Sequence, residues 1–206
     1  MLKILGRKNS SNVQKVVWAC DEIGLPFTRE DVGGPFGRNK DPDYLALNPN
    51  GTIPTVIDDG FALWESNAIV RYIAGKHGVG KICPEDARER ALADQWMDWQ
   101  QTVVNPGLSP VFYNLIRMKP PERDMAAVKA GRDKLSAAMA ILDKHLTKND
   151  FVVGPRFSMG DIPLGIAVYR WYELAIERED YPALKKWFDR LAARPAFQKN
   201  VMFGLS

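Results

Sequence analysis

Residues 52–74 have the sequence TIPTVIDDGFALWESNAIVRYIA. Two apolar runs flank Asp-Asp-Gly, a tripeptide that favours a tight turn between short strands. The apolar side chains from Ala68 to Ile73 then repeat at helical spacing, which predicts a helix beginning near Ser66. The chain must therefore fold around two short strands that lead directly into a helix.

Pro54 lies inside the first of these strands. A proline has no N–H for a sheet ladder, so the segment must lie at an edge or enter the strand through a bend, with a cis peptide bond as one form of that bend. The bend leaves the backbone of Ile53 exposed, and an extended peptide can add to it by antiparallel hydrogen bonds. The alternative is a turn proline without a functional role.

Glu65 and Ser66 occupy the predicted start of the helix. Free N–H groups and the helix dipole attract a carboxylate at this end. Ser66 can add a hydroxyl donor and Glu65 can accept a hydrogen bond from an ammonium group, so the pair suits the head group of an α-amino acid. The alternative is that both residues only cap the helix.

The pattern of apolar residues changes after about His77. Before it, strands alternate with helices, which predicts an α/β domain over 1–77. A Gly-rich linker is expected over 78–86, and an all-helical domain over 87–206, in which Pro106 and Pro110 bend or break the first helix. The expected strands are 2–5, 27–32 and the two in 52–64; the expected helices are 11–23, 66–76, 86 to beyond 104, 121–146, 161–176 and 182–193.

Composition excludes several classes of protein. The 206 residues carry a formal net charge of +3 without a run of Lys or Arg, so nucleic acid and anionic membranes are not expected partners. No stretch approaches the roughly 20 apolar residues that span a bilayer, and the N-terminal apolar run is too short for a signal peptide. We therefore expect a cytoplasmic protein.

Hydrolytic and metal chemistry lack support in the sequence. Cys20 shares an apolar helical stripe with its neighbours, which indicates a buried packing residue rather than a nucleophile. No motif links His77 or His145 to Ser11, as a catalytic triad would require. We expect no metal site, and the distant pair Cys20 and Cys83 predicts no disulfide framework.

Four motifs together resemble the cytosolic glutathione S-transferases over nearly the whole chain. They are a serine at the first helix, NPNGTIPTV, WESNAI and FVVGPRFSMGDIPLG. The last one also contains a capping box, Ser158 to Asp161, that serves folding. The resemblance is to the serine classes, because no Tyr ends the first strand.

The resemblance implies a thioredoxin-like N-terminal domain in which Pro54 is cis and Ile53 pairs with the cysteinyl unit of glutathione. Glu65 and Ser66 would hold the γ-glutamyl end. Further residues match positions near the glycyl end: Asn39, Lys40 and Thr52. Delta-type relatives have a histidine where this chain has Gly51, so one contact to the glycyl carboxylate is either missing or supplied by Lys40.

The resemblance also implies thiol activation by Ser11, with Ser10 as the alternative and Asn12 assisting. Lowering a thiol pKa from about 8.5 by two units requires about 2.7 kcal/mol of preference for the thiolate. One hydrogen bond to a charged group contributes roughly 1.5–3 kcal/mol, so a serine hydroxyl and the helix dipole suffice without a base.

The expected function is that of a dimeric glutathione transferase acting in detoxification, with glutathione as co-substrate and a small hydrophobic electrophile. Three aromatic residues are candidates for binding the electrophile, although aromatic residues at helical spacing are more often core: Phe112, Tyr113 and Trp171. The stripe Trp96, Trp99 and Val103 suits a dimer contact. The alternatives are a non-catalytic or regulatory glutathione-binding protein of the same fold, and a glutathione-dependent peroxidase or isomerase.

Overall fold

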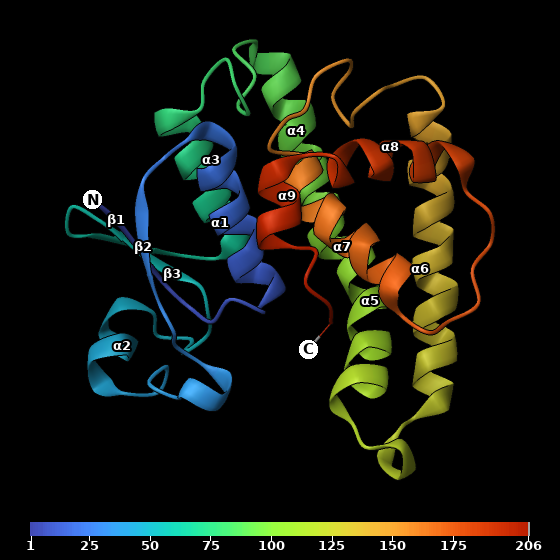
Figure 1. The fold of residues 1–206 in the computed structure, drawn as a ribbon, viewed down its shortest axis with the longest axis horizontal. Helices are drawn as coiled ribbons and strands as arrows, with labels where there is room; N and C mark the ends of the chain where they lie inside the picture. The colour runs from blue at the N-terminus through green and yellow to red at the C-terminus, as the bar shows by residue number, and fades with distance from the viewer. Residues whose placement is uncertain (206) are drawn as a thin grey trace. The chain divides into compact units, whose positions relative to one another are not determined.

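Strands β1 to β4 form one mixed sheet in the order β2-β1-β3-β4 (Figure 1). The parallel pair is β1–β2, whereas β3 runs antiparallel to both β1 and β4. Ile4 lies opposite Val56, and Thr55 lies opposite Trp64. The strands are β1 Leu2–Leu5, β2 Phe27–Glu30, β3 Thr55–Asp58 and β4 Phe61–Trp64.

The computed structural model describes residues 1–205, in which the chain forms two compact units, Met1–Glu85 and Asp86 onward. The first is a thioredoxin-like α/β unit, and the second is helical (Figure 1). The predicted fold class is therefore confirmed. The predicted limits of the two domains and of their linker stay a prediction.

Helices α1, Ser11–Ile23, and α3, Ser66–His77, pack against each other in the first unit. Every residue of α1 from Val13 to Cys20 is buried, so this helix is enclosed on all sides. It ends at Gly24, whose φ of 72° is the left-handed conformation that glycine adopts at little cost. A short helix not predicted from the sequence, α2 Pro42–Leu47, contributes Tyr44 to a cluster with Leu5 and Val32.

The helical unit begins with a continuous helical path, so the chain is not broken at Pro106 or Pro110, and the alternative of a bend there stays a prediction. A five-residue π-helical segment lies on each side of the helix α5, Asn105–Phe112. In a π-helix each N–H bonds to the carbonyl five residues earlier, and this spacing lets the helix continue past a proline, which has no N–H to donate. The path runs through α4 Ala87–Trp99, η2 Gln100–Val104, α5 Asn105–Phe112 and η3 Tyr113–Arg117.

The predicted start of the next helix at 121 is wrong. Residues Pro120–Glu122 form a 3₁₀ turn, η4. Helix α6, Met125–Leu146, therefore begins four residues after the predicted start at 121. Asp124 caps α6, because its carboxylate accepts a hydrogen bond from the Ala127 N–H at 2.9 Å. The remaining helices are α7 Asp161–Glu173, α8 Pro182–Ala192 and α9 Pro195–Asn200, of which α9 was not predicted.

Helices α5 and α6 approach each other closely at two glycines. A Cβ added to Gly107 would lie 2.9 Å from the Leu135 backbone nitrogen, and one added to Gly131 would lie 2.7 Å from the Gly107 carbonyl oxygen. Real Cβ atoms do not approach other atoms so closely. The contact between the two helices therefore depends on the absence of side chains at both positions.

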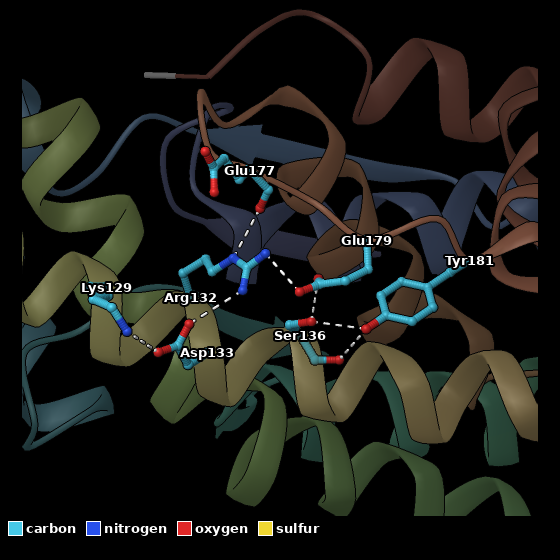
Figure 2. Close-up of polar contacts among 7 residues, drawn as sticks. All are labelled: Lys129, Arg132, Asp133, Ser136, Glu177, Glu179 and Tyr181. Carbon is cyan, nitrogen blue, oxygen red and sulfur yellow. Dashed lines mark hydrogen bonds and ion pairs between the residues drawn. The ribbon is translucent and has the colours of Figure 1, made fainter.

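The segment between α7 and α8 is held on α6 by a polar network (Figure 2). Arg132 forms an ion pair with Glu179 at 2.7 Å and donates to the Glu177 carbonyl oxygen at 3.0 Å. Ser136 contacts both Glu179 and the Tyr181 hydroxyl. These contacts lower the pKa of Glu179, with the hydrogen bond from Ser136 as the main cause. The network fixes the long connection that precedes α8.

Candidate active site

The Ile53-Pro54 peptide bond is cis and connects the preceding loop to β3. The Thr52 carbonyl oxygen accepts hydrogen bonds from the Tyr44 hydroxyl at 2.6 Å and from Asn48 Nδ2 at 2.9 Å. Tyr44 and Asn48 are buried and also contact Thr55 Oγ1. A buried polar network therefore fixes the backbone immediately before the cis peptide bond.

The backbone N–H and carbonyl oxygen of Ile53 lie at this bend. Within residues 1–205, no backbone hydrogen bond uses its N–H or its carbonyl oxygen. Its side chain packs on Gly33, where an added Cβ would lie 3.1 Å from Ile53 Cδ1. A backbone that is anchored on one side and has both polar groups available suits the addition of an extended peptide.

Loop residues around Asn39 and Lys40 lie beside Gly51. Asn39 Nδ2 donates to the Gly51 carbonyl oxygen at 2.8 Å, and Lys40 Nζ donates to the Asn50 carbonyl oxygen at 3.2 Å. A Cβ added to Gly51 would lie only 2.6 Å from Lys40 Nζ, and its φ of 59° is left-handed. The Lys40 ammonium thus occupies the space that a side chain at position 51 would need.

Glu65 forms the one-residue junction between β4 and α3. Its φ of 69° is unusual for a residue other than glycine, and its side chain makes no capping hydrogen bond to the helix. The Glu65 side chain therefore does not cap α3, which was the alternative to ligand binding. The exposed carboxylate lies at the N-terminus of α3 and is available to a cation.

Ser66 connects the starts of two helices. It is 5% exposed, and its hydroxyl donates to Asn12 Oδ1 at 3.2 Å while accepting from Lys15 Nζ at 3.3 Å. Asn12 and Lys15 both belong to α1, whereas Ser66 is the first residue of α3. The structure therefore brings the N-terminal turns of α1 and α3 together.

Lys15 was not among the predicted site residues, although it is only 2% exposed. Its burial follows from the enclosure of α1 on all sides, which the apolar stripe of Val13, Val16, Val17 and Cys20 does not reveal. The only signal in the sequence is a lysine four residues after Ser11, and most lysines at such positions are exposed.

Ser10 and Ser11 both lie at the N-terminus of α1. Ser10 is the residue before the helix and its hydroxyl caps no backbone N–H, while Ser11 is the first helical residue. Both are partly exposed. The position at the positive end of the helix dipole suits stabilisation of an anion by either hydroxyl.

Cys20, His77 and His145 do not contribute side chains to the group formed by Asn12, Lys15 and Ser66. Cys20 is fully buried, and burial raises the pKa of its thiol to about 12. Its prediction as a packing residue is confirmed. His77 is exposed at the end of α3, and His145 Nε2 lies 3.0 Å from the Val152 carbonyl oxygen in the helical unit. Over residues 1–205, no group of three His, Cys, Asp or Glu side chains is placed to hold a metal ion.

The aromatic residues predicted to bind an electrophile differ in exposure. Tyr113 is 57% exposed, Phe112 is 9% exposed, and Trp171 has no exposed surface. The Arg170 guanidinium lies 3.9 Å from the centre of the Phe112 ring, which is a cation–π contact. Because Trp171 is enclosed in the core of the helical unit and Phe112 nearly so, Tyr113 is the one of the three with a largely exposed side chain.

Comparisons with protein families match both units. A family model described as "Glutathione S-transferase, N-terminal domain" matches residues 9–76, and one described as "Glutathione S-transferase, C-terminal domain" matches residues 104–195. No helix in the described part of the chain has the length and apolar character needed to cross a membrane.

Individual relatives cover all or nearly all of the chain. Glutathione S-transferase GstB of Escherichia coli is 38% identical over 208 residues, with 100% of each chain covered. Glutathione S-transferase 3 of Zea mays is 32% identical, with 97% of this chain and 93% of the relative covered. The glutathione-bound crystal structure of the theta class glutathione S-transferase of Xanthomonas axonopodis pv. citri has a TM-score of 0.96 and 43% identity, with 100% of this chain and 99% of that chain covered.

Proposed function

The chain belongs to the glutathione S-transferase family, and we propose that it activates the glutathione thiol as a thiolate, which then attacks a small hydrophobic electrophile. The observation that carries the proposal is the arrangement of the β3–β4 hairpin. Because Thr55 pairs with Trp64, Pro54 and Glu65 lie at the same end of the hairpin. We infer that the start of α3 and the Ile53 backbone, which makes no backbone hydrogen bond in the described chain, together hold one short peptide.

The γ-glutamyl and cysteinyl parts of glutathione fit two features of this end. The Ile53 backbone offers a donor and an acceptor to the cysteinyl unit. The Glu65 carboxylate suits the ammonium group of the γ-glutamyl unit, and Ser66, with the N–H groups of α3, suits its α-carboxylate. The theta class relative from Xanthomonas axonopodis pv. citri has glutathione bound in its crystal structure, which supports the same ligand here.

The glycyl carboxylate fits Lys40 and Asn39. Both side chains are anchored on the loop at Gly51, and the ammonium of Lys40 takes the space of a residue 51 side chain. Thr52 is exposed next to them, while its carbonyl oxygen is engaged with Tyr44 and Asn48. Lys40 is thus the cation that we propose for the glycyl end.

Thiol activation falls to Ser11, with Ser10 as the alternative and Asn12 as the assisting residue. A serine hydroxyl at the start of α1 supplies a hydrogen bond to the thiolate, and the helix dipole adds to it. Tyr113, exposed in the helical unit, is our candidate for contact with the electrophile. We further propose a cytoplasmic location and a homodimer.

The test is the ultraviolet absorbance of the thiolate of bound glutathione against pH, for the wild type, Ser11→Ala and Ser10→Ala. Ser11→Ala should raise the pKa of the bound thiol by about one to two units, because the lost hydrogen bond is worth roughly 1.5–3 kcal/mol and each unit about 1.4. Turnover at neutral pH should fall about ten- to a hundredfold. Glutathione affinity should change little.

The other outcomes decide between the alternatives. A shift in Ser10→Ala alone would assign the role to Ser10. A wild type that titrates near 8.5, with no effect of either variant, would replace the transferase by a glutathione-binding protein without thiol activation. A screen with aryl halides, epoxides, isothiocyanates and organic hydroperoxides separates transferase from peroxidase activity. A failure to bind at millimolar glutathione in calorimetry would refute the proposal as a whole.

A further inference from the structure

Lys15 is a charged residue enclosed in the α/β unit. It is 2% exposed, on a helix whose neighbouring residues from Val13 to Cys20 are also buried. Removing an ammonium group from water costs several kcal/mol unless strong partners replace the water. A methionine would fill the same volume in an apolar helix at far lower cost, so packing alone does not explain a lysine at this position.

The Lys15 ammonium donates to the hydroxyl of Ser66 at the start of α3. Its Nζ lies 3.3 Å from Ser66 Oγ, and that oxygen lies 3.2 Å from Asn12 Oδ1. An ammonium has only donors, so Ser66 must be the acceptor in the first contact. The single hydroxyl proton of Ser66 is then directed away from Lys15, to Asn12 or to a ligand. Lys15 thus fixes Ser66 as a donor.

We propose that Lys15 is a positioning residue for the α-carboxylate of the γ-glutamyl unit, acting through Ser66. The inference rests on the proposed binding of glutathione at the start of α3. A hydroxyl that accepts a hydrogen bond from a cation is polarised and becomes a stronger donor. The ligand carboxylate and Asn12 Oδ1 compete for the same Ser66 proton, and the carboxylate wins because it is charged.

This arrangement also links the γ-glutamyl end of the ligand to the thiol of its central cysteinyl unit. When Ser66 turns its proton to the carboxylate, Asn12 Oδ1 loses that donor. Asn12 is the neighbour of Ser11 and lies one helical turn before Lys15. Binding of the γ-glutamyl head group is therefore coupled to the residues that we propose to act on the thiol.

The experiment compares two ligands by calorimetry. One is glutathione, and the other is 4-aminobutyryl-cysteinylglycine, which is glutathione without the α-carboxylate of its glutamyl unit. Lys15→Met should weaken glutathione binding about tenfold or more, since it removes the cation that polarises Ser66. Binding of the analogue should change less than about twofold, so the preference for glutathione should shrink by nearly the same factor.

Two further variants separate positioning from packing. Gln14→Met removes another buried polar group from α1 and should leave the preference between the two ligands as in the wild type. In a Ser66→Ala background, Lys15→Met should have little further effect on the preference, because both changes act on one contact. Lys15→Arg keeps a donor and a charge and should restore part of the preference.

The outcomes that would overturn the proposal are distinct from a failure of the proposed function. An equal loss of affinity for both ligands in Lys15→Met would show that Lys15 only supports the fold, and an unchanged preference would refute its role outright. If Lys15→Met does not fold by circular dichroism, Lys15→Gln gives the same comparison with an uncharged donor. A wild type that binds neither ligand would instead refute glutathione binding itself.

Discussion

Glu65 turns the chain from strand to helix in a single left-handed residue. With φ of 69° and ψ of 109°, its backbone conformation costs on the order of 1–3 kcal/mol for a residue other than glycine. The strain persists because β4 ends at Trp64 and α3 begins at Ser66, and both elements are held by their own packing. The exposed carboxylate stays at the helix N-terminus, where we propose that the ligand ammonium binds.

Cys20 should be inert in the folded protein. Burial excludes reagents, and raising its thiol pKa from 9.0 to about 12 reduces the thiolate fraction about a thousandfold at mildly alkaline pH. We expect no rapid reaction of this thiol with an aromatic disulfide reagent at pH 8. A Cys83→Ala variant leaves Cys20 as the single thiol to be followed.

The control for this measurement is the same variant unfolded in guanidinium chloride, where one thiol per chain should react at once. Reaction of a full equivalent within seconds in the folded variant would contradict the assignment of Cys20 to the core.

Among the elements, α7 begins at a buried carboxylate. Asp161 has no exposed surface and accepts hydrogen bonds from the Ser158 N–H at 2.9 Å, the Val152 N–H at 3.0 Å and Trp187 Nε1 at 2.9 Å. Burial nevertheless raises its pKa to about 6, because no hydrogen bond fully replaces the lost water. The Ser158 hydroxyl accepts a hydrogen bond from the Gly160 N–H at 3.3 Å, so both side chains satisfy N–H groups near this helix start, and Asp161 also ties α8 to α7 through Trp187.

This raised pKa predicts a pH dependence of stability. Between about pH 4 and 6 the folded state holds the Asp161 proton while the unfolded state releases it, so this contribution is complete at low pH and is lost as pH rises through about 6. At about 1.4 kcal/mol per unit, a rise of about two units corresponds to about 3 kcal/mol. The difference in unfolding free energy between wild type and Asp161→Asn should fall by about this amount from about pH 3 to 7.

Urea unfolding of both proteins at several pH values checks this expectation. Subtracting the variant removes the titration of the other carboxyl groups, which stabilise in the opposite direction when they are paired. A difference that is constant, or that grows with pH, would contradict the burial effect.

The elements that the sequence predicts well are those with a long pattern or a marked start. The limits of α1 agree at both ends, since a Ser-Ser start and Gly24 mark them. Helices α2 and α9 have six residues each, which is too short for a 3.6-residue period to become visible. The sequence predicts the start of α6 too early, because Pro121 resembles a first helical residue, while Asp124 is the residue that caps the helix.

The same distinction holds for the candidate site. Pro54, Glu65 and Ser66 carry local chemical signals, a missing N–H and a helix start, so the sequence alone nominates them as candidates. Lys15 was not found, because its burial and its contact with Ser66, 51 residues away, depend on the packing of α1 against α3. Long-range packing of this kind has no counterpart in a local sequence pattern.

For the whole molecule, family membership predicts a homodimer. The stripe expected to support it is only partly available, since Trp96 is 8% exposed and its ring contacts Trp99 edge-on and His145 at a tilt. Val103, which is 40% exposed, is the residue of the stripe that a partner can contact most directly. Light scattering at micromolar concentration should give the mass of two chains.

A charge at this position should weaken the association. We expect Val103→Glu to shift the mass toward one chain, because burying an unpaired carboxylate in an apolar contact is costly. Ile141→Glu is the matched control, as it places the same charge on an exposed apolar position of α6. A wild type that remains a monomer would argue against the dimer, and equal effects of both variants would argue against an interface at Val103.

The contact between Gly107 and Gly131 limits how this chain can change over evolutionary time. An added methyl group at either position meets the backbone of the opposite helix, and a backbone cannot be exchanged for a smaller one. No compensating substitution elsewhere therefore rescues a change at one of the two sites. We expect lineages that keep this helix pair to keep both glycines, so that the two positions identify corresponding residues in relatives whose remaining sequence has diverged.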